Sequence, residues 1–157
     1  MENLKIINIS FKQYTNKNEL LPKDLKLVNE ANQALLNAHA PYSAFQVGAA
    51  IELEDGQIVT GSNQENAAYP SGLCAERVAI FYASAQYPNK LIKTIAVTAK
   101  SAKSEIDKNV SPCGACRQVI AEFEKKQKSP IKIIFMGPSN SYLSCDGIAQ
   151  LLPLAFE

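Results

Sequence analysis

Apolar side chains recur every three or four residues after Pro22, and this spacing predicts an amphipathic helix that ends near His39. A proline is tolerated in the first turn of a helix, because its missing N–H would have no helical partner there. The apolar positions are Leu25, Val28, Ala31, Leu35 and Ala38. One face of this segment is therefore expected to be buried.

Two apolar runs, 46–53 and 57–62, flank Glu54-Asp55-Gly56, and an Asp-Gly pair between such runs is typical of a β-hairpin. A polar loop, 63–72, follows. Beyond it the patterns predict a helix at about 73–86, a strand at 93–98, a polar surface loop at 99–110, a helix at 113–126 and strands at 131–136 and 142–145. Strands alternating with helices favour an α/β sandwich, with one mixed sheet between helical layers.

The N-terminal residues are polar apart from one weakly alternating apolar cluster. This cluster consists of Leu4, Ile6, Ile7, Ile9 and Phe11. The pattern fits either a short edge strand or an arm, and it does not decide between them. We predict an N-terminal extension at 1–21 and a single domain at 22–157.

The composition narrows the possible partners. With 157 residues, 46% hydrophobic and 20% charged, the chain suits one globular domain. A formal charge of +1 gives no broad basic field for a phosphate backbone, so we expect a small uncharged substrate and no nucleic acid. No apolar run approaches the roughly 18 residues that span a bilayer, and no signal peptide is visible, so we expect a cytoplasmic protein without a membrane partner.

The cysteines provide the main chemical signal. Cys74 is followed two residues later by Glu76, and Cys113 and Cys116 form a Cys-x-x-Cys motif after Pro112. In a cytosolic chain this spacing favours metal or redox chemistry over a disulfide framework. A catalytic zinc site has three protein ligands and leaves the fourth position to water. The three cysteines would be those ligands, and Glu76 would stand beside the fourth position and move protons.

Three thiolates give a zinc–cysteine unit a formal charge of −1, which makes the metal a poorer Lewis acid. Arg77 lies three residues after Cys74 on one helical face, so it can hydrogen-bond the sulfurs and draw off charge. Helices that begin at Cys74 and Cys113 would stabilise the thiolates further through their N-terminal N–H groups.

Two alternatives use the same cysteines differently. Cys145 could close the zinc shell as a fourth ligand and make a non-enzymatic zinc-binding module, although we interpret it as a small buried hydrophobic residue. The Cys113–Cys116 motif could also belong to a thiol-disulfide oxidoreductase, but then Glu76 would have no role. His39, the only histidine, is interpreted as a partly exposed residue at a helix end.

The Cys-x-Glu and Pro-Cys-x-x-Cys segments together form the zinc-deaminase signature. With segments 41–50, 61–70 and 151–156 in the same order, the chain resembles the small cytidine deaminases of the homotetrameric, all-cysteine type. The resemblance implies a three-layer α/β/α sandwich with a mixed five-stranded sheet and one Zn²⁺ per subunit. It also implies hydrolytic deamination of cytidine and deoxycytidine to uridine and deoxyuridine, with release of ammonia, in pyrimidine salvage.

The resemblance also assigns substrate-binding positions. It implies that Asn63 and Glu65 bind the ribose hydroxyl, that Phe45 packs on the base, and that Ala67, Tyr69 and Phe156 reach pockets shared between subunits. The backbone N–H of Ala75 could bind the pyrimidine carbonyl. From the residues alone, the Asn63–Glu65 stretch is also an ordinary polar loop, and Phe45 is equally a core side chain.

Relatives with the same chemistry remain as rivals. A deaminase of the blasticidin-S type, or one of another modified nucleoside, would share the cysteine motifs and differ in its pocket walls. The near-neutral charge disfavours RNA or DNA editing. The polar loop 101–109 looks longer than is usual for the family, and the N-terminal extension is additional; both lie outside the motif segments.

Overall fold

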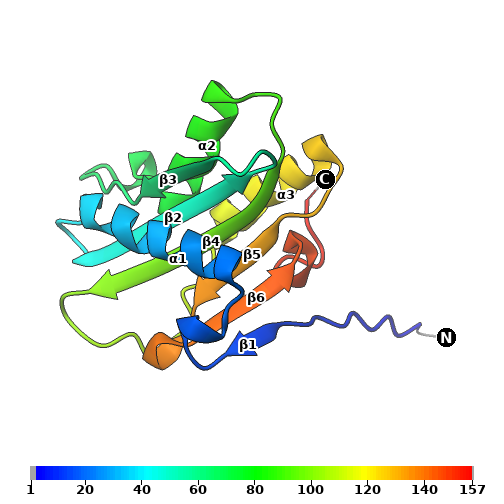
Figure 1. Cartoon of the computed structure of the whole chain (residues 1–157), viewed down its shortest axis with the longest axis horizontal. Helices are drawn as coiled ribbons and strands as arrows, with labels where there is room; N and C mark the ends of the chain where they lie inside the picture. Colours follow the sequence, from blue (N-terminus) through cyan, green and yellow to red (C-terminus); the bar gives the residue numbers. More distant parts are fainter. Residues whose placement is uncertain (1–2, 157) are drawn as a thin grey trace.

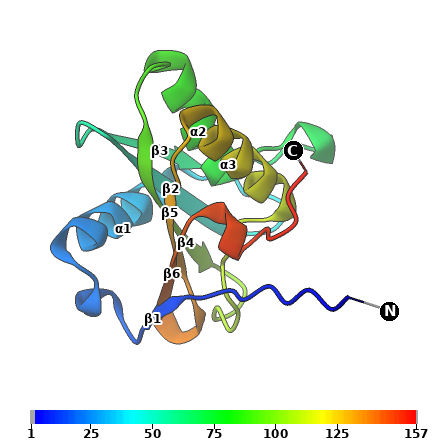
Figure 2. The ribbon, with the colours of Figure 1, turned by 90° about the vertical axis from the view of Figure 1, so that its right-hand side faces the viewer.

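The computed structural model describes residues 3–156 as a mixed sheet between helical layers. The strands are β1 (Lys12–Tyr14), β2 (Phe45–Leu53), β3 (Ile58–Ser62), β4 (Ile92–Ser101), β5 (Lys132–Met136) and β6 (Tyr142–Asp146). The helices are α1 (Pro22–Ala34), α2 (Ala75–Gln86) and α3 (Gly114–Gln127), with short 3₁₀ turns at Lys17–Glu19, Leu35–Asn37, Tyr69–Ser71, Pro138–Asn140 and Ile148–Gln150. Helix α1 covers one face of the sheet, and α2 and α3 cover the other (Figures 1 and 2). The predicted α/β/α sandwich is confirmed.

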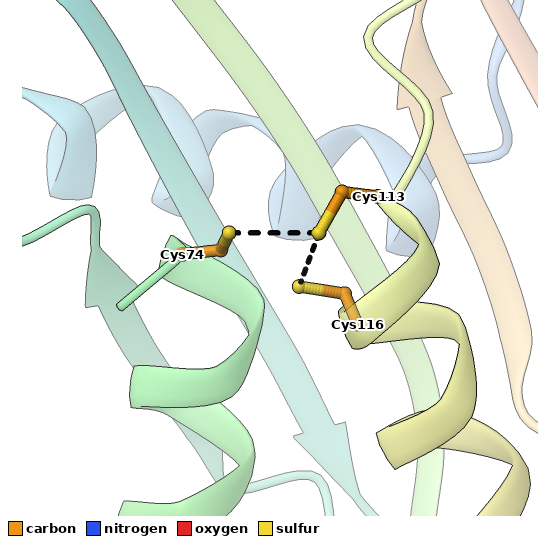
Figure 3. A group of neighbouring side chains, drawn as sticks. All are labelled: Cys74, Cys113 and Cys116. Carbon is orange, nitrogen blue, oxygen red and sulfur yellow. Dashed lines mark hydrogen bonds between the residues drawn. The ribbon is translucent and has the colours of Figure 1, made fainter. Parts of the chain in front are cut away.

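The strand order is β1-β6-β5-β4-β2-β3. Strands β4 and β5 are parallel, and the other neighbouring pairs are antiparallel. The parallel pair requires a crossover connection, and α3 provides it. The connections β3-α2-β4 and β4-α3-β5 step in the same direction across the sheet, so right-handed crossovers place both helices over the same face. Their N-terminal ends lie near one another (Figure 3).

The sheet has six strands, so the expected count of five is wrong. The sixth is β1, which pairs antiparallel with β6 in the register Lys12 to Ser144. This edge strand begins directly after the apolar cluster for which the sequence left an edge strand or an arm open, and the residues of the cluster stay outside the sheet and exposed, such as Leu4 at 86%. Phe11 is the exception, because its ring packs edge-on against Phe135 at a centroid distance of 6.1 Å.

Strand β4 is longer at its C-terminal end than the predicted strand at 93–98. It continues to Ser101 because 99–101 pairs with the start of β2, in the register Phe45 to Ser101. The polar surface loop therefore begins after Ser101. The predicted hairpin agrees with the structure: β2 and β3 flank the Asp-Gly turn, where Gly56 has φ 83°, a left-handed conformation that favours glycine.

Two hydrophobic cores lie on opposite faces of the sheet. Successive residues of β4 alternate between them, with Ile95 and Val97 in the core under α2 and α3 and Ala96 in the core under α1. This alternation follows from the two-residue period of a strand. Since both faces of β4 are buried, it forms the centre of the domain and a rigid support for the loops at its ends.

Gly61 sets how closely α2 approaches the sheet. A Cβ at this position would lie 2.6 Å from the Ala75 carbonyl oxygen and 2.6 Å from the Ala79 nitrogen, so only a hydrogen atom fits. The first turn of α2 therefore rests directly on β3. That turn carries Glu76 and follows Cys74, so this contact fixes the position of the residues with the strongest chemical signal.

The N-terminal extension packs onto the rest of the chain. Besides the pairing of β1, the backbone N–H of Ser10 donates to Gln150 Oε1 at 2.8 Å. The domain boundary at residue 22 stays a prediction, and residues 1, 2 and 157 of the predicted ranges lie outside the described part. Within residues 3–156, no helix has the length and apolar character needed to cross a membrane.

Candidate metal centre and active site

Three cysteine sulfurs converge at the starts of two helices (Figure 3). Cys74 directly precedes α2, Cys113 directly precedes α3, and Cys116 lies in the first turn of α3. The Sγ atoms of Cys74 and Cys113 are 3.7 Å apart, those of Cys113 and Cys116 are 3.5 Å apart, and all three lie within 4.8 Å of one another. Zinc–sulfur bonds of about 2.3 Å at tetrahedral angles place sulfurs about 3.8 Å apart. The group therefore fits Zn²⁺.

The surroundings of Cys74 favour its thiolate form. A hydrogen bond with Cys116, together with smaller contributions from Arg77 and Cys113, outweighs burial and lowers the pKa of Cys74 to about 5. The same hydrogen bond, together with burial and nearby Glu76, raises the pKa of Cys116. Arg77 Nη2 lies 3.8 Å from Cys74 Sγ and 3.5 Å from the Gly72 carbonyl oxygen. The guanidinium of Arg77 therefore contacts one of the sulfurs that it was predicted to hydrogen-bond.

Glu76 is the second residue of α2 and is buried, with 4% of its surface exposed. Burial raises the pKa of its carboxyl group to about 7, and the negative charge of Cys74 adds to this effect. The Cys116 thiol and Arg77 act in the opposite direction. A carboxyl group with this pKa can both accept and release a proton near neutral pH, which suits a general acid–base.

Cys74, Cys113 and Glu76 line one cavity of about 600 Å³. Its wall combines the turn before β2, the start of β2, the loop after β3, the start of α2 and the segment before α3. The lining residues are Tyr42, Ser43, Phe45, Val47, Asn63, Gln64, Glu65, Asn66, Tyr69, Gly72, Leu73, Cys74, Glu76, Arg77, Val97, Val110, Ser111 and Cys113. Such a cavity is large enough for a nucleoside-sized ligand.

Comparison with known proteins identifies the family. Residues 21–130 match the cytidine and deoxycytidylate deaminase zinc-binding region. The chain belongs to this family. It is 49% identical to a cytidine deaminase of Sporosarcina psychrophila over 84% of this chain and 90% of that protein. It is 39% identical to the cytidine deaminase of Halalkalibacterium halodurans over 83% and 91%. The crystal structure of the cytidine deaminase from Burkholderia pseudomallei is similar, with a TM-score of 0.71 and 35% identity over 83% of this chain and 97% of that chain.

Several substrate-binding positions predicted from the deaminase resemblance lie together. Phe45, Asn63, Glu65 and Tyr69 all line the cavity that contains Glu76. The Asn63 side chain is bonded to the backbone of β2, because its Oδ1 accepts from the Val47 N–H at 2.8 Å and its Nδ2 donates to the Phe45 carbonyl at 3.0 Å. Asn63 therefore also holds the first residues of β2 in place.

Three predicted positions do not line this cavity. Ala75 is fully buried as the first residue of α2, while Ala67 is exposed in the loop after β3. Phe156 is 86% exposed, and its carbonyl oxygen accepts a hydrogen bond from Gln118 Nε2 at 2.9 Å. The single chain thus leaves Ala67 and Phe156 outside the site to which the deaminase resemblance assigns them.

Two residues near the site were missed by the sequence reasoning. Ser43 lines the cavity and contacts Glu65. Arg117 donates to the carbonyl oxygens of Pro112 at 2.7 Å and Leu151 at 2.8 Å, so it joins the cysteine-bearing turn to the C-terminal segment. Arg117 directly follows Cys116, and Ser43 stands two residues before Phe45, so closeness to predicted residues was the available signal.

The fourth cysteine lies apart from the deaminase site. Cys145 is a buried residue of β6 within the core, and its Sγ faces the Gly147 carbonyl oxygen at 3.8 Å. Burial raises the pKa of its thiol to about 11. This agrees with its interpretation as a small buried hydrophobic residue, and within residues 3–156 the potential metal-binding group holds Cys74, Cys113 and Cys116 without it. His39 is exposed and pairs through its backbone with Gln64.

Proposed function

We propose that the protein catalyses the zinc-dependent hydrolytic deamination of cytidine and deoxycytidine to uridine and deoxyuridine, with release of ammonia. The observation that carries this proposal is the group of three cysteine sulfurs, two of which, Cys74 and Cys113, line the same cavity as the buried Glu76. The similarity to curated cytidine deaminases supports it. In the cell, such a reaction would serve pyrimidine salvage.

In this proposal Cys74, Cys113 and Cys116 hold one Zn²⁺ per subunit, and Arg77 offsets part of their negative charge. Zinc, when bound, supplies a Lewis acid that lowers the pKa of water toward 7. Glu76 takes a proton from the water that attacks C4 of the pyrimidine and gives it to the neighbouring ring nitrogen. Glu76 then takes the proton of the new C4 hydroxyl and passes it to the amine, the C4–N bond breaks as the C4 carbonyl forms, and ammonia leaves.

The charges of the cavity support a nucleoside over a nucleotide as substrate. Among the described residues that line it, Arg77 is the single basic side chain, and it already contacts Cys74. The other charged side chains there are Glu65 and Glu76. A phosphate group would meet two carboxylates and no free cation, which disfavours its binding. We assign the sugar to Asn63 and Glu65, the base to Phe45, and the pyrimidine carbonyl to the backbone N–H of Ala75.

We further propose a homotetramer with active sites shared between subunits, as predicted from the resemblance. Tyr69 and Phe156 are 74% and 86% exposed in the single chain, which suits aromatic residues that contact a neighbouring subunit. Ala67 would take part in the same contacts. Light scattering coupled to size-exclusion chromatography measures the subunit count; a monomer at micromolar concentration would contradict this part. The cytoplasmic location stays a prediction.

The test of function is a pair of proteins loaded with zinc, the parent and Glu76→Gln. The parent should convert cytidine with one ammonia released per nucleoside, and Glu76→Gln should keep its zinc and lose activity by roughly 10²–10⁴-fold. An intact, zinc-loaded parent that converts neither cytidine nor deoxycytidine would contradict the proposal. A panel of other aminopyrimidine nucleosides, including blasticidin S, then identifies a relative with different specificity.

A further inference from the structure

The turn 41–45 connects two residues that the proposed function assigns to the substrate. The Ser43 hydroxyl donates a hydrogen bond to the Glu65 carboxylate, and its oxygen accepts one from the Phe45 N–H at 3.0 Å. The backbone N–H groups of Tyr42 and Ser43 also donate to Glu65 Oε2, at 2.9 Å and 3.2 Å. One side chain thus contacts both the sugar-binding carboxylate and the strand start that carries the base-packing ring.

The turn has a defined conformation. Ala44 has φ 56°, in the left-handed region, where a residue other than glycine costs about 1–2 kcal/mol. Two backbone hydrogen bonds hold it there: the Ala44 N–H donates to the Ala40 carbonyl, and the Ala44 carbonyl accepts from the Ala102 N–H, both at 3.1 Å. A third hydrogen bond closes the turn: the Phe45 N–H donates to the hydroxyl oxygen of Ser43, two residues earlier.

The contacts also fix the state of the carboxylate. The hydrogen bond from Ser43 is the largest influence that lowers the pKa of Glu65, so the group stays ionised and acts as an acceptor only. An ionised carboxylate has about four acceptor positions. The three donors from the turn leave one for a hydroxyl donor in the cavity that Glu65 lines.

We propose that Ser43 is a positioning residue that fixes the Glu65 carboxylate relative to Phe45 and thereby sets the preference for substrates with a free hydroxyl on the sugar ring. This inference rests on the proposed function. In the arrangement described above, Ser43 contacts neither the reacting carbon nor the metal ligands. The effect of Ser43 acts through Glu65, so it depends on whether the substrate offers a hydroxyl to that carboxylate.

The experiment compares cytidine with 2′,3′-dideoxycytidine, which keeps the base and lacks both ring hydroxyls. Ser43→Ala should raise KM for cytidine about tenfold and change kcat less than about twofold, because it removes a bond to a charged group that orients substrate. For the dideoxynucleoside KM should change less than about twofold. Ser43→Thr and Ser43→Val form a pair of equal size, and only Thr should retain the preference for cytidine.

Two controls separate this effect from general damage. Ser141→Ala removes another turn hydroxyl, which donates to the Pro138 carbonyl at 2.7 Å away from the cavity, and it should leave both constants unchanged. In a Glu65→Ala background, Ser43→Ala should have no further effect on the ratio between the two substrates. Zinc content and melting temperature of each variant report on folding.

The outcomes are distinguishable. If the zinc-loaded parent deaminates no cytidine, the proposed function fails. If the parent is active but Ser43→Ala affects both substrates equally, or if Thr and Val behave alike, the positioning role is refuted. An effect of Ser43→Ala that persists without Glu65 would equally overturn it.

Discussion

Replacing Arg77 by Gln removes the positive charge beside the sulfur cluster and keeps a side chain of similar reach. Arg77 Nη2 lies 3.8 Å from Cys74 Sγ, and Arg77 is one of the residues that line the cavity. The thiolate form of Cys74 would lose its cationic neighbour, so protons would compete better with zinc for the sulfur. We therefore expect weaker zinc binding and a slower reaction.

The magnitude follows from the separation of the charges. Two unit charges about 4 Å apart attract by about 4 kcal/mol at an effective dielectric constant near 20, and by about 1 kcal/mol in water. Arg77 is partly exposed in the wall of an open cavity, so the lower half of this range applies. A loss of about 1–2 kcal/mol corresponds to a roughly 5–30-fold fall in zinc affinity.

The assay is competition for zinc with a chromophoric chelator, at pH values from about 6 to 8, together with kcat/KM for cytidine at saturating zinc. Arg77→Lys is the matched control, because it keeps the positive charge and loses the planar guanidinium group. The zinc affinity of Arg77→Lys should lie between those of the parent and Arg77→Gln. The difference in zinc affinity between Arg77→Gln and the parent should grow as the pH falls, because protonation of the thiolate competes with zinc binding. Equal zinc affinity and equal kcat/KM in Arg77→Gln would refute this reasoning.

Three further predictions concern other parts of the chain. Cys145→Ser should keep full zinc content and activity, and it should lower the melting temperature by a few degrees because it places a hydroxyl in the core. Zinc content is measured by elemental analysis, and loss of zinc would favour the four-cysteine zinc-binding module. Gly61→Ala should lower the free energy of unfolding in urea by about 1–3 kcal/mol, since its Cβ would meet the Ala75 carbonyl at 2.6 Å; an unchanged midpoint would contradict the close approach. In the metal-free protein, Glu76→Gln should raise the free energy of unfolding by about 3 kcal/mol near pH 8 and leave it unchanged near pH 4. The folded pKa of Glu76, about 7, lies above the ordinary value of 4.5 for a glutamate, so stability is lost as the pH rises through the folded pKa. A pH-independent difference would refute this.

Local patterns predicted the helices and the hairpin because each depends on residues close in sequence. Helix α1 begins at Pro22, as its spacing indicated, and β2 and β3 flank the predicted turn. Strand β1 and the end of β4 depend on partners far along the chain, Ser144 for Lys12 and Phe45 for Ser101. A strand of three residues, Lys12–Tyr14, is too short to carry a local signal of such a partner.

The metal centre was predictable for a related reason. The spacing Cys113-x-x-Cys116 places two sulfurs within one turn at the start of a helix, so the sequence alone constrains their distance. The position of Cys74 against them required the family resemblance, because Cys74 and Cys113 are 39 positions apart in sequence and strand β4 lies between them. Ser43 was missed since its partner Glu65 lies 22 residues away, and no spacing rule joins a turn serine to that carboxylate.

The proposed role of the buried Glu76 carboxyl group as the base agrees with the charges that the site would carry with zinc bound. Three thiolates, a divalent ion, the guanidinium of Arg77 and an ionised Glu76 together carry one excess negative charge, and this charge lies where burial already disfavours it. When Glu76 accepts a proton, the formal charge falls to zero. Proton transfer to Glu76 is therefore favoured by the same burial that raises its pKa, and Arg77 limits the excess to a single charge. Removing Arg77 would add a second negative charge, so the effects of Arg77→Gln and Glu76→Gln on zinc affinity should be non-additive.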